Sequence, residues 1–273
     1  MLSGAYPMSW DHADEFRDKL RRGQLCLGTV ISLKDPTITE ALGPLFDFFW
    51  IDMEHSVLSL EAVQAHVMAT RATGAASLVR VPWNDPVLIK PVLDLGAAGV
   101  IVPMVRTADD VRRAVAACLY PPEGIRGFGP RRPSQYGRLG GPEFCRAANA
   151  RVLPVVQVEH IDAVENIDQI LAVPGLASIA FGPNDLAGSM GFTGQPRHPD
   201  VLRAIDSVIT QCRQSGVPVG TSVGEDPEIL ADWVARGVNW LSMGSDLSLM
   251  LRAAAQAIGH VRERTASEHQ EAP

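Results

Sequence analysis

Short apolar runs alternate along the chain with longer segments in which apolar residues recur at helical spacing. Most of the short runs are apolar throughout, as expected for parallel strands that are covered on both faces. They predict strands at 25–32, 47–53, 76–82, 99–104, 152–158, 176–182, 217–223 and 238–244. The longer segments predict helices at 36–46, 59–73, 86–96, 107–118, 162–172, 199–215, 227–236 and 247–263, with one more at about 13–22 in front.

Residues typical of helix ends support this order of elements. Asp85 and Asp226 each stand directly before a proline at the start of a predicted helix, and Gly74 and Gly216 follow helix ends. Eight strand-and-helix units without a low-complexity linker predict an α/β fold, a single (β/α)8 TIM barrel with an extra N-terminal helix. A doubly wound open sheet is the competing fold, but residues 32–36 lack the glycine-rich turn that usually follows its first strand.

The length of 273 residues and the 46% hydrophobic content allow one large core. We therefore expect one domain over residues 1–273, with a flexible tail from about 265 to 273. The one irregular stretch, 120–141, is rich in Gly, Pro and Arg. Loops of that length are usually functional or disordered, so we expect it over the barrel mouth or at a subunit contact.

Charge and cysteine content limit which kinds of partner and which cellular compartment we expect. The net charge of −7 is spread along the chain without a basic stripe, which argues against a nucleic acid partner. The four cysteines form no CxxC pair or zinc-finger spacing, and they indicate reduced thiols in a cytoplasmic protein. The chain begins without a signal-peptide pattern and lacks an apolar run of about 20 residues, so we expect a soluble protein without a membrane partner.

Two carboxylates follow adjacent predicted strands. Glu159 closes the run 153–159, and Asp185 follows the run 176–184. In a barrel these positions lie at the mouth, where chemistry takes place. Either acid alone could cap a helix or pair with an arginine. Together they make an oxygen-rich position that suits a divalent cation with retained waters, and such a site accepts Mg2+, Mn2+ or Co2+.

Three further residues are candidates for catalysis. His55 follows the second predicted strand beside Asp52 and Glu54, which could orient its ring, although a structural histidine is the alternative. Arg80 lies in an apolar strand and needs an anion there, either a structural salt bridge or a substrate carboxylate. Asp94 lies near a helix end, where its charge opposes the dipole, and a required hydrogen-bond partner would explain it.

Six ordered segments carry a family resemblance: 51–56 (IDMEHS), 78–82 (LVRVP), 92–105 (VLDLGAAGVIVPMV), 120–127 (YPPEGIRG), 157–159 (QVE) and 181–186 (FGPNDL). In register from about 25 to 250, the chain resembles the HpcH/HpaI family of class II pyruvate aldolases. The resemblance implies a divalent-metal-dependent enzyme that reversibly cleaves 4-hydroxy-2-oxo acids to pyruvate and an aldehyde through a metal-stabilised pyruvate enolate. It also implies a homo-oligomer, commonly a hexamer built as a trimer of dimers, in which neighbouring barrels exchange the last helix.

The resemblance assigns roles to the candidate residues position by position. Glu159 and Asp185 correspond to the metal ligands, His55 to the catalytic base, and Asp94 to the acid that supports this base. The chain departs from the family pattern at His160, where Thr or another small polar residue is more common after the metal-binding Glu.

The remaining correspondences concern the substrate. Arg80 matches the residue that binds pyruvate and stabilises its enolate, and Gln157, Asn184 and Asp185 match substrate contacts. A Schiff-base aldolase would need a lysine at the mouth. Only Lys34 of the three lysines could approach it, so we disfavour that route. No nucleotide-binding motif occurs in the proper context, so the divalent metal is the one cofactor we expect.

Two other functions stay open. An oxaloacetate-type decarboxylase or another C–C lyase could use the same enolate site, and a barrel that only binds or scaffolds would need no turnover. The aldehyde is not specified by these residues. Arg126 and Arg131 in the 120–141 loop suggest an acidic acceptor, such as a semialdehyde.

Overall fold

The structure is a computed structural model that describes residues 13–270, with side chains placed as far as Thr265. Eight strands form one closed barrel in which each strand pairs in parallel with the next and β1 pairs with β8. The strands are β1 (Cys26–Ile31), β2 (Phe48–Asp52), β3 (Ala76–Arg80), β4 (Gly99–Val102), β5 (Leu153–Val158), β6 (Ser178–Phe181), β7 (Val219–Val223) and β8 (Trp240–Ser245). The predicted TIM barrel and all eight predicted strands are therefore confirmed.

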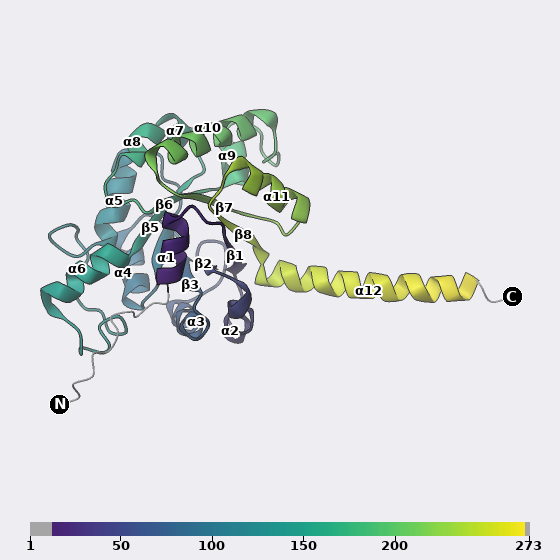
Figure 1. Cartoon of the computed structure of the whole chain (residues 1–273), viewed down its shortest axis with the longest axis horizontal. Helices are drawn as coiled ribbons and strands as arrows, with labels where there is room; N and C mark the ends of the chain where they lie inside the picture. The colour runs from purple at the N-terminus through teal and green to yellow at the C-terminus, as the bar shows by residue number, and fades with distance from the viewer. Residues whose placement is uncertain (1–12, 271–273) are drawn as a thin grey trace.

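Helices surround the barrel (Figure 1). In chain order they are α1 (Asp14–Arg21), α2 (Thr37–Leu42), the 3-10 helix η1 (Gly43–Leu45), α3 (Leu60–Thr73), α4 (Pro86–Asp94), α5 (Ala108–Cys118), α6 (Gly141–Arg151), α7 (Ile161–Glu165), α8 (Ile167–Leu171), α9 (Pro183–Ser189), α10 (Pro199–Ser215), α11 (Pro227–Arg236) and α12 (Asp246–Gln270). The extra N-terminal helix is confirmed as α1. Its Phe16 packs against Phe48 at the amino ends of the strands, with ring centroids 5.3 Å apart.

Several predicted boundaries were wrong. The sequence did not predict the helices α6 and α9, and the predicted helix 162–172 is divided at Asn166 into α7 and α8. The last helix runs to Gln270, and the stretch 265–270 contains no Gly or Pro that would end it. The flexibility expected from about 265 stays a prediction. Residues 271–273 of the expected tail lie outside the described residues.

Side-chain alternation along the strands makes two cores. Outward-facing residues such as Phe49 and Ile51 pack beneath the helices. Inward-facing residues fill the barrel interior, among them Phe48, Trp50 and Trp240. Because large rings occupy this interior, the barrel is a packed core, and open space is left towards the carboxyl ends of the strands.

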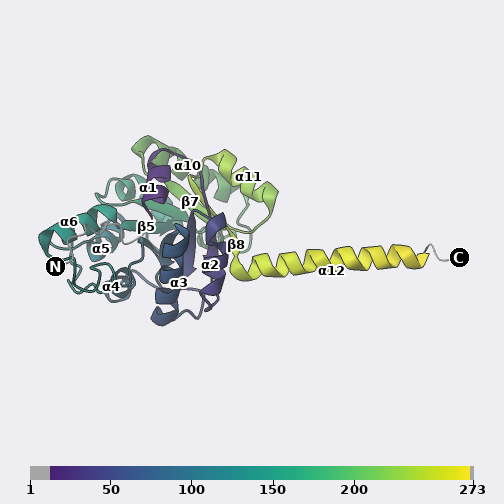
Figure 2. The same cartoon turned by 60° about the horizontal axis from the view of Figure 1, so that its bottom comes forward.

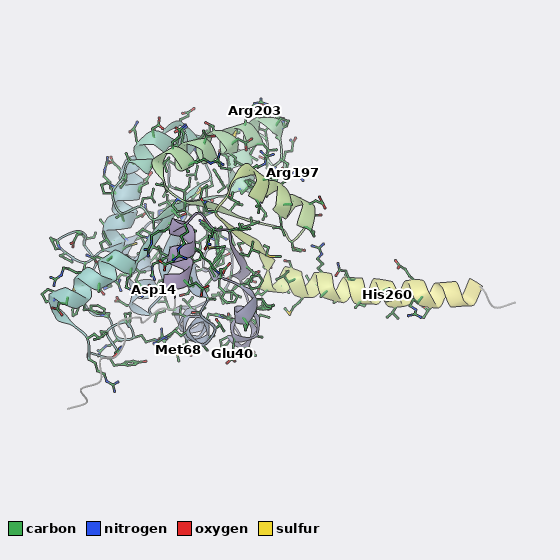
Figure 3. The ribbon with its side chains drawn as sticks, in the orientation of Figure 1. Asp14, Glu40, Met68, Arg197, Arg203 and His260 are labelled. Carbon is green, nitrogen blue, oxygen red and sulfur yellow. The ribbon has the colours of Figure 1, made fainter. Side chains whose placement is uncertain are left out.

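The helix α12 differs from the others because it projects away from the barrel in both views (Figures 1 and 2). Its outer part, including the labelled His260, lies well beyond the barrel (Figure 3). It exposes large apolar side chains at Leu247, Met250, Leu251, Ile258 and Val261. Exposed apolar surface of this extent is typical of a protein contact.

The first residue of α12 fixes where this helix leaves the barrel. Asp246 is fully buried, and its carboxylate accepts hydrogen bonds from the backbone N–H groups of Ser32 and Leu33, each at 2.9 Å. It also accepts the Ser32 hydroxyl at 2.7 Å. The start of α12 is therefore tied to the loop that follows β1.

Two observations bear on the environment of the protein. Among residues 13–270, no helix has the length and apolar character needed to cross a membrane. Cys26, Cys118, Cys145 and Cys212 are all free thiols, and three of them are buried.

Candidate active site

A cavity of about 240 Å³ opens at the carboxyl ends of the strands. It is lined by Trp50, His55, Arg80, Gln157, Phe181, Gly182, Pro183, Asn184, Asp185 and Ser222. We call this space the mouth cavity. Five of the seven residues singled out in the sequence line it: His55, Arg80, Gln157, Asn184 and Asp185. Strand ends far apart in the sequence meet here because the barrel closes all eight of them into one ring.

Arg80 is held at the last residue of β3 by two acids. Its Nε and Nη2 donate to the two oxygens of Asp52 at 2.9 and 2.7 Å, and its Nη1 lies 3.1 Å from the Glu54 carboxylate. Asp52 and Arg80 are register partners on β2 and β3, which places them side by side. The salt bridge supplies the anion that a buried arginine requires, and the guanidinium still faces the mouth cavity.

His55 lies on the loop between β2 and α3, and its side chain is exposed. Its side chain is 66% exposed, and its Nε2 lies 3.7 Å from the Glu54 carboxylate. The backbone N–H of His55 donates to Asp52 at 3.3 Å, which fixes the loop beneath the ring. Within the described chain Glu54 is therefore the acid beside the imidazole, and the ring is free to meet a molecule in the cavity.

Glu159 is buried, and both of its carboxylate oxygens are held. The backbone N–H of Met104 donates to one oxygen at 2.6 Å, and the Gln157 side-chain amide donates to the other at 2.7 Å. The pKa of Glu159 is raised to about 7, chiefly by burial and in part by the nearby Glu54 and Asp185, while the Met104 hydrogen bond opposes the rise. The site thus keeps carboxylates close together at an energetic cost.

The backbone around Glu159 is adapted to this arrangement. Met104 has a φ of 55°, in the left-handed region that a non-glycine residue rarely adopts, and this turn brings its N–H to Glu159. A Cβ atom on Gly182 would collide with the Glu159 carboxylate, so only glycine leaves room there. Neither feature is visible as a pattern in the sequence.

These carboxylates fit a divalent cation. Among residues 13–270 no group of three His, Cys, Asp or Glu side chains forms a complete metal cage. Mg2+ and similar ions need only one or two protein carboxylates, because waters and substrate oxygens complete the shell. A cation between Glu159 and Asp185 would offset both the burial of the Glu159 charge, which is the main cause of its raised pKa, and the repulsion from nearby carboxylates.

Asp94 lies elsewhere in the chain. It is the last residue of α4, and its carboxylate accepts a hydrogen bond from Arg126 Nη2 at 2.7 Å. Because α4 runs back from the mouth, its end lies at the amino ends of the strands, opposite His55. Within one chain Asp94 therefore has Arg126 as its partner, and the structure does not bring it to His55.

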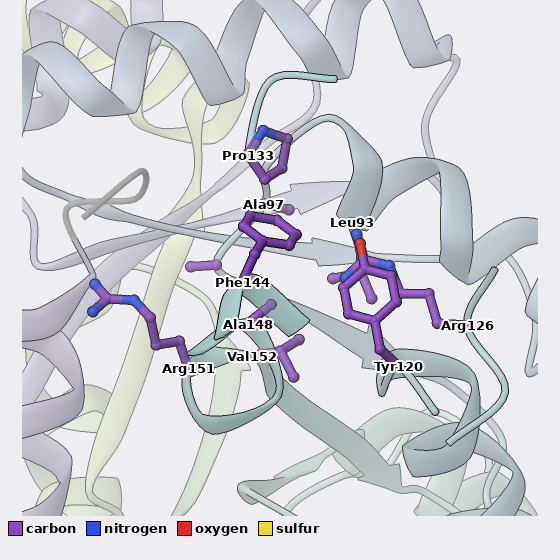
Figure 4. A pocket seen from close by; sticks show the side chains of 10 residues that line it. Leu93, Ala97, Tyr120, Arg126, Pro133, Phe144, Ala148, Arg151 and Val152 are labelled. Atoms are coloured by element: carbon purple, nitrogen blue, oxygen red, sulfur yellow. The ribbon is translucent and has the colours of Figure 1, made fainter. Parts of the chain in front are cut away.

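The 120–141 loop lies at the same end as Asp94, so its expected position over the mouth was wrong for a single chain. The loop follows α5, and Arg132 Nη1 donates to the carbonyl of Leu95 at 2.8 Å. Figure 4 shows Arg126 and Tyr120 from this loop beside Leu93, around a small cavity at the amino ends of the strands. The guanidinium of Arg126 lies 4.5 Å from the centre of the Tyr120 ring.

His160 has a local structural role. It is the N-cap of α7, and its Nδ1 accepts the backbone N–H of Asp162 at 3.1 Å. An N-cap acceptor is also what a Thr or Ser at this position would supply. The departure from the family pattern therefore preserves a helix cap beside Glu159.

Comparisons with known proteins agree with this geometry. The family model HpcH/HpaI aldolase/citrate lyase matches residues 31–253. A 2-dehydro-3,6-dideoxy-6-sulfogluconate aldolase of Pseudomonas putida is 37% identical over 91% of this chain and 97% of its own length. A 4-hydroxy-2-oxo-heptane-1,7-dioate aldolase of Shigella flexneri is 36% identical over 88% of this chain and 90% of its own.

Solved structures are similar over nearly the same span. An HpcH/HpaI aldolase/citrate lyase family protein from Burkholderia cenocepacia superposes with a TM-score of 0.86 at 33% identity. The match covers 91% of this chain and 99% of that one. The barrel, and not only its motifs, is therefore shared with these proteins.

Proposed function

This chain belongs to the HpcH/HpaI aldolase/citrate lyase family, and we propose that it is a divalent-metal-dependent aldolase that reversibly cleaves a 4-hydroxy-2-oxo acid to pyruvate and an aldehyde. Its relatives are named aldolases, which are carbon-carbon lyases. One observation carries the proposal: His55, Arg80, Gln157, Asn184 and Asp185 line one cavity, with Glu159 hydrogen-bonded to Gln157 beside it.

In this proposal Glu159 and Asp185 hold Mg2+, Mn2+ or Co2+. The bound ion supplies a Lewis acid that polarises the keto oxygen of the 2-oxo acid. The hydrogen bonds from Met104 and Gln157 favour the ionised form of Glu159, so they prepare the carboxylate to act as a ligand. Asn184, which lines the mouth cavity next to Asp185, contacts the substrate.

The chain's own residues then handle charge and protons. His55, exposed at the mouth, accepts the proton of the C4 hydroxyl as the C3–C4 bond breaks and the aldehyde leaves. Arg80 faces the negative charge that develops on the keto oxygen of the enolate, and its bidentate contact with Asp52 keeps it in place. Return of a proton to C3 completes pyruvate.

The acceptor in this proposal is an acidic aldehyde. The names of both aldolase relatives describe substrates with an acidic group at the end remote from the 2-oxo acid. In this chain Arg126 lies away from the mouth cavity, so the arginines of the 120–141 loop can act on substrate only across a subunit contact.

A homo-oligomer, a hexamer arranged as a trimer of dimers, accounts for features that one chain leaves unexplained. The projecting α12 carries exposed apolar side chains that a neighbouring barrel would cover. Asp94 can support a His55 only if that histidine belongs to a neighbouring chain, because its own His55 lies at the opposite end of the barrel. The four free thiols are compatible with work in the reducing cytoplasm.

Deuterium exchange into the methyl group of pyruvate tests the function. Wild-type protein with Mg2+, Mn2+ or Co2+ should exchange the methyl protons with D2O, and Glu159→Gln and His55→Ala should abolish this exchange. His160→Ser, which keeps a helix-capping side chain, is the matched control and should exchange normally. No metal-dependent exchange by the wild type would contradict the proposal. A higher kcat/KM for oxaloacetate than for any 4-hydroxy-2-oxo acid would favour the decarboxylase.

A further inference from the structure

Two tryptophans meet inside the barrel, and their indole N–H groups differ. The rings of Trp50 on β2 and Trp240 on β8 lie 5.9 Å apart, and both side chains are at most 1% exposed. Trp240 Nε1 donates to the Ser178 hydroxyl at 2.9 Å. Trp50 Nε1 has no hydrogen-bond partner among the residues that the structure describes. The two buried indoles thus provide an internal comparison.

An unpaired buried N–H is unfavourable, because the group has lost its water without gaining another acceptor. Nearly all such groups in folded proteins are paired, so the exception at Trp50 calls for an acceptor from outside the chain. Trp50 lines the mouth cavity and Trp240 does not. Of the two indoles, the unpaired one therefore belongs to the residue that borders the mouth cavity.

The surroundings of Trp50 favour an anionic or strongly polar acceptor. The Arg80 guanidinium lies 5.2 Å from the centre of the Trp50 ring. Gln157, which lines the same cavity, has a buried side-chain oxygen that is likewise without a partner in the described part of the chain. An open donor and an open acceptor at one cavity match a ligand that carries both oxygen acceptors and a hydroxyl.

We propose that Trp50 is a substrate-binding residue whose indole N–H donates to an oxygen of the bound 2-oxo acid at the floor of the mouth cavity. The inference rests on the proposed function and adds a residue to it. The ring packs against both Trp240 and Arg80, which restricts the direction of its N–H. A fixed donor specifies how the acid lies against Arg80, in the way that preorganised donors orient ligands.

Phenylalanine substitution separates the donor from the ring. Calorimetry with pyruvate and Mg2+ should give a Kd for Trp50→Phe roughly ten- to a hundredfold above the wild type, as expected for a lost hydrogen bond to a charged group. Without pyruvate, the variant should melt at or above the wild-type Tm because an unpaired buried donor has been removed.

Trp240→Phe is the matched control. It removes an equally buried indole N–H, but one that is paired with Ser178. This variant should have a lower Tm than the wild type and an unchanged Kd for pyruvate. A rise in Kd as large as that of Trp50→Phe would assign the effect to packing and overturn the proposal. A wild-type Kd for Trp50→Phe would overturn it too, and would indicate that a water satisfies the Trp50 N–H.

A measurement on the wild type removes the dependence on variant folding. In protein labelled with nitrogen-15 at the indole, pyruvate with Mg2+ should shift the N–H resonance of Trp50 and leave that of Trp240 in place. Pyruvate binding without such a shift overturns the role of Trp50 while the proposed function stands. Absence of both pyruvate binding and methyl exchange in the wild type overturns both.

Discussion

Two largely covered arginines lie at opposite ends of the barrel in closely similar settings. Arg80 at the mouth pairs with Asp52 and lies over Trp50, and Arg126 at the amino ends of the strands pairs with Asp94 and lies over Tyr120. The two arginines differ in the volume of the cavity beside them. The cavity at Arg80 measures about 240 Å³, and the one at Arg126 about 20 Å³. The second holds little more than a water molecule.

The two sites also differ in charge. Arg80 faces Asp52 and Glu54, and the carboxylates of Glu159 and Asp185 lie close by, so the mouth carries more acid than one guanidinium can balance. Within one chain, Arg126 and Asp94 form a simple pair. A buried ion pair over a ring is therefore a poor sign of catalysis by itself. Open volume together with surplus carboxylates is the informative combination.

The largest effect is expected from breaking the pair at the amino ends of the strands. Arg126→Met leaves Asp94 without its cation, and loss of one partner from a buried pair typically costs about 3–5 kcal/mol. The free energy of unfolding from urea titration should fall by this amount. The variant should lower kcat/KM less than Arg80→Met does. An equal loss of kcat/KM in both variants would contradict the view that catalysis depends more on Arg80 at the mouth than on Arg126 at the amino ends of the strands.

Arg80→Met tests the mouth in the same way. Loss of a fixed charge that faces the developing enolate should lower kcat/KM for a 4-hydroxy-2-oxo acid about 10²–10³-fold. Steady-state kinetics at saturating Mg2+ measure the effect. Arg80→Lys keeps the charge without the bidentate geometry, so its kcat/KM should lie between those of the wild type and Arg80→Met. Full activity in Arg80→Met would show that the arginine only balances Asp52.

The surplus of carboxylates can be tested through pH. The pKa of Glu159 is raised from 4.5 to about 7, chiefly by burial, so the folded chain binds this proton more tightly than the unfolded chain. The free energy of unfolding should therefore fall as pH rises from 4.5 to 7, by roughly 3 kcal/mol in the absence of metal.

Glu159→Gln should remove this dependence. The metal-free variant should be more stable than the wild type at about pH 8 and similar to it at about pH 4, as measured by denaturant titration. Added Mg2+ should stabilise the wild type alone, because a ligand stabilises only the state that binds it. If the unfolding free energies of the wild type and Glu159→Gln changed equally with pH, Glu159 would not be the source of the pH dependence.

The smallest effect concerns a residue that lies at the mouth without facing the cavity. His160→Ala removes the α7 N-cap and should cost about 1 kcal/mol of unfolding free energy, with His160→Ser restoring most of it. Metal affinity, measured by calorimetry, should not change in either variant. A loss of metal affinity in His160→Ala, but not in His160→Ser, would show that the cap at this position contributes to the metal site.

The sequence predicted the barrel and most of its mouth for one physical reason. Buried parallel strands have a clear apolar pattern, and their carboxyl ends must meet, so His55, Arg80 and Gln157 could be placed together. Asp94 could not be placed in this way, because its position depends on where a helix ends. For the loop 120–141 the sequence allowed the mouth or a subunit contact. The first is wrong within one chain, because irregular segments need not gather at the mouth, and the second stays a prediction.

Other features depend on contacts that no local pattern encodes. The hydrogen bond from Met104 to Glu159 requires a backbone turn between β4 and α5, and the unpaired N–H of Trp50 depends on what surrounds the ring. The apolar run 47–53 predicted a strand and did not single out Trp50. The place of Trp50 beside the mouth cavity follows from the alternation of faces once the barrel has closed.

The Asp246 contacts give the projecting helix a mechanical consequence. Asp246 begins α12 and also binds the backbone of Ser32 and Leu33, where β1 ends. The base of the helix is therefore fixed to the rim of the mouth. A body that held the outer part of α12 would therefore be connected, through Asp246, to the β1 end of that rim.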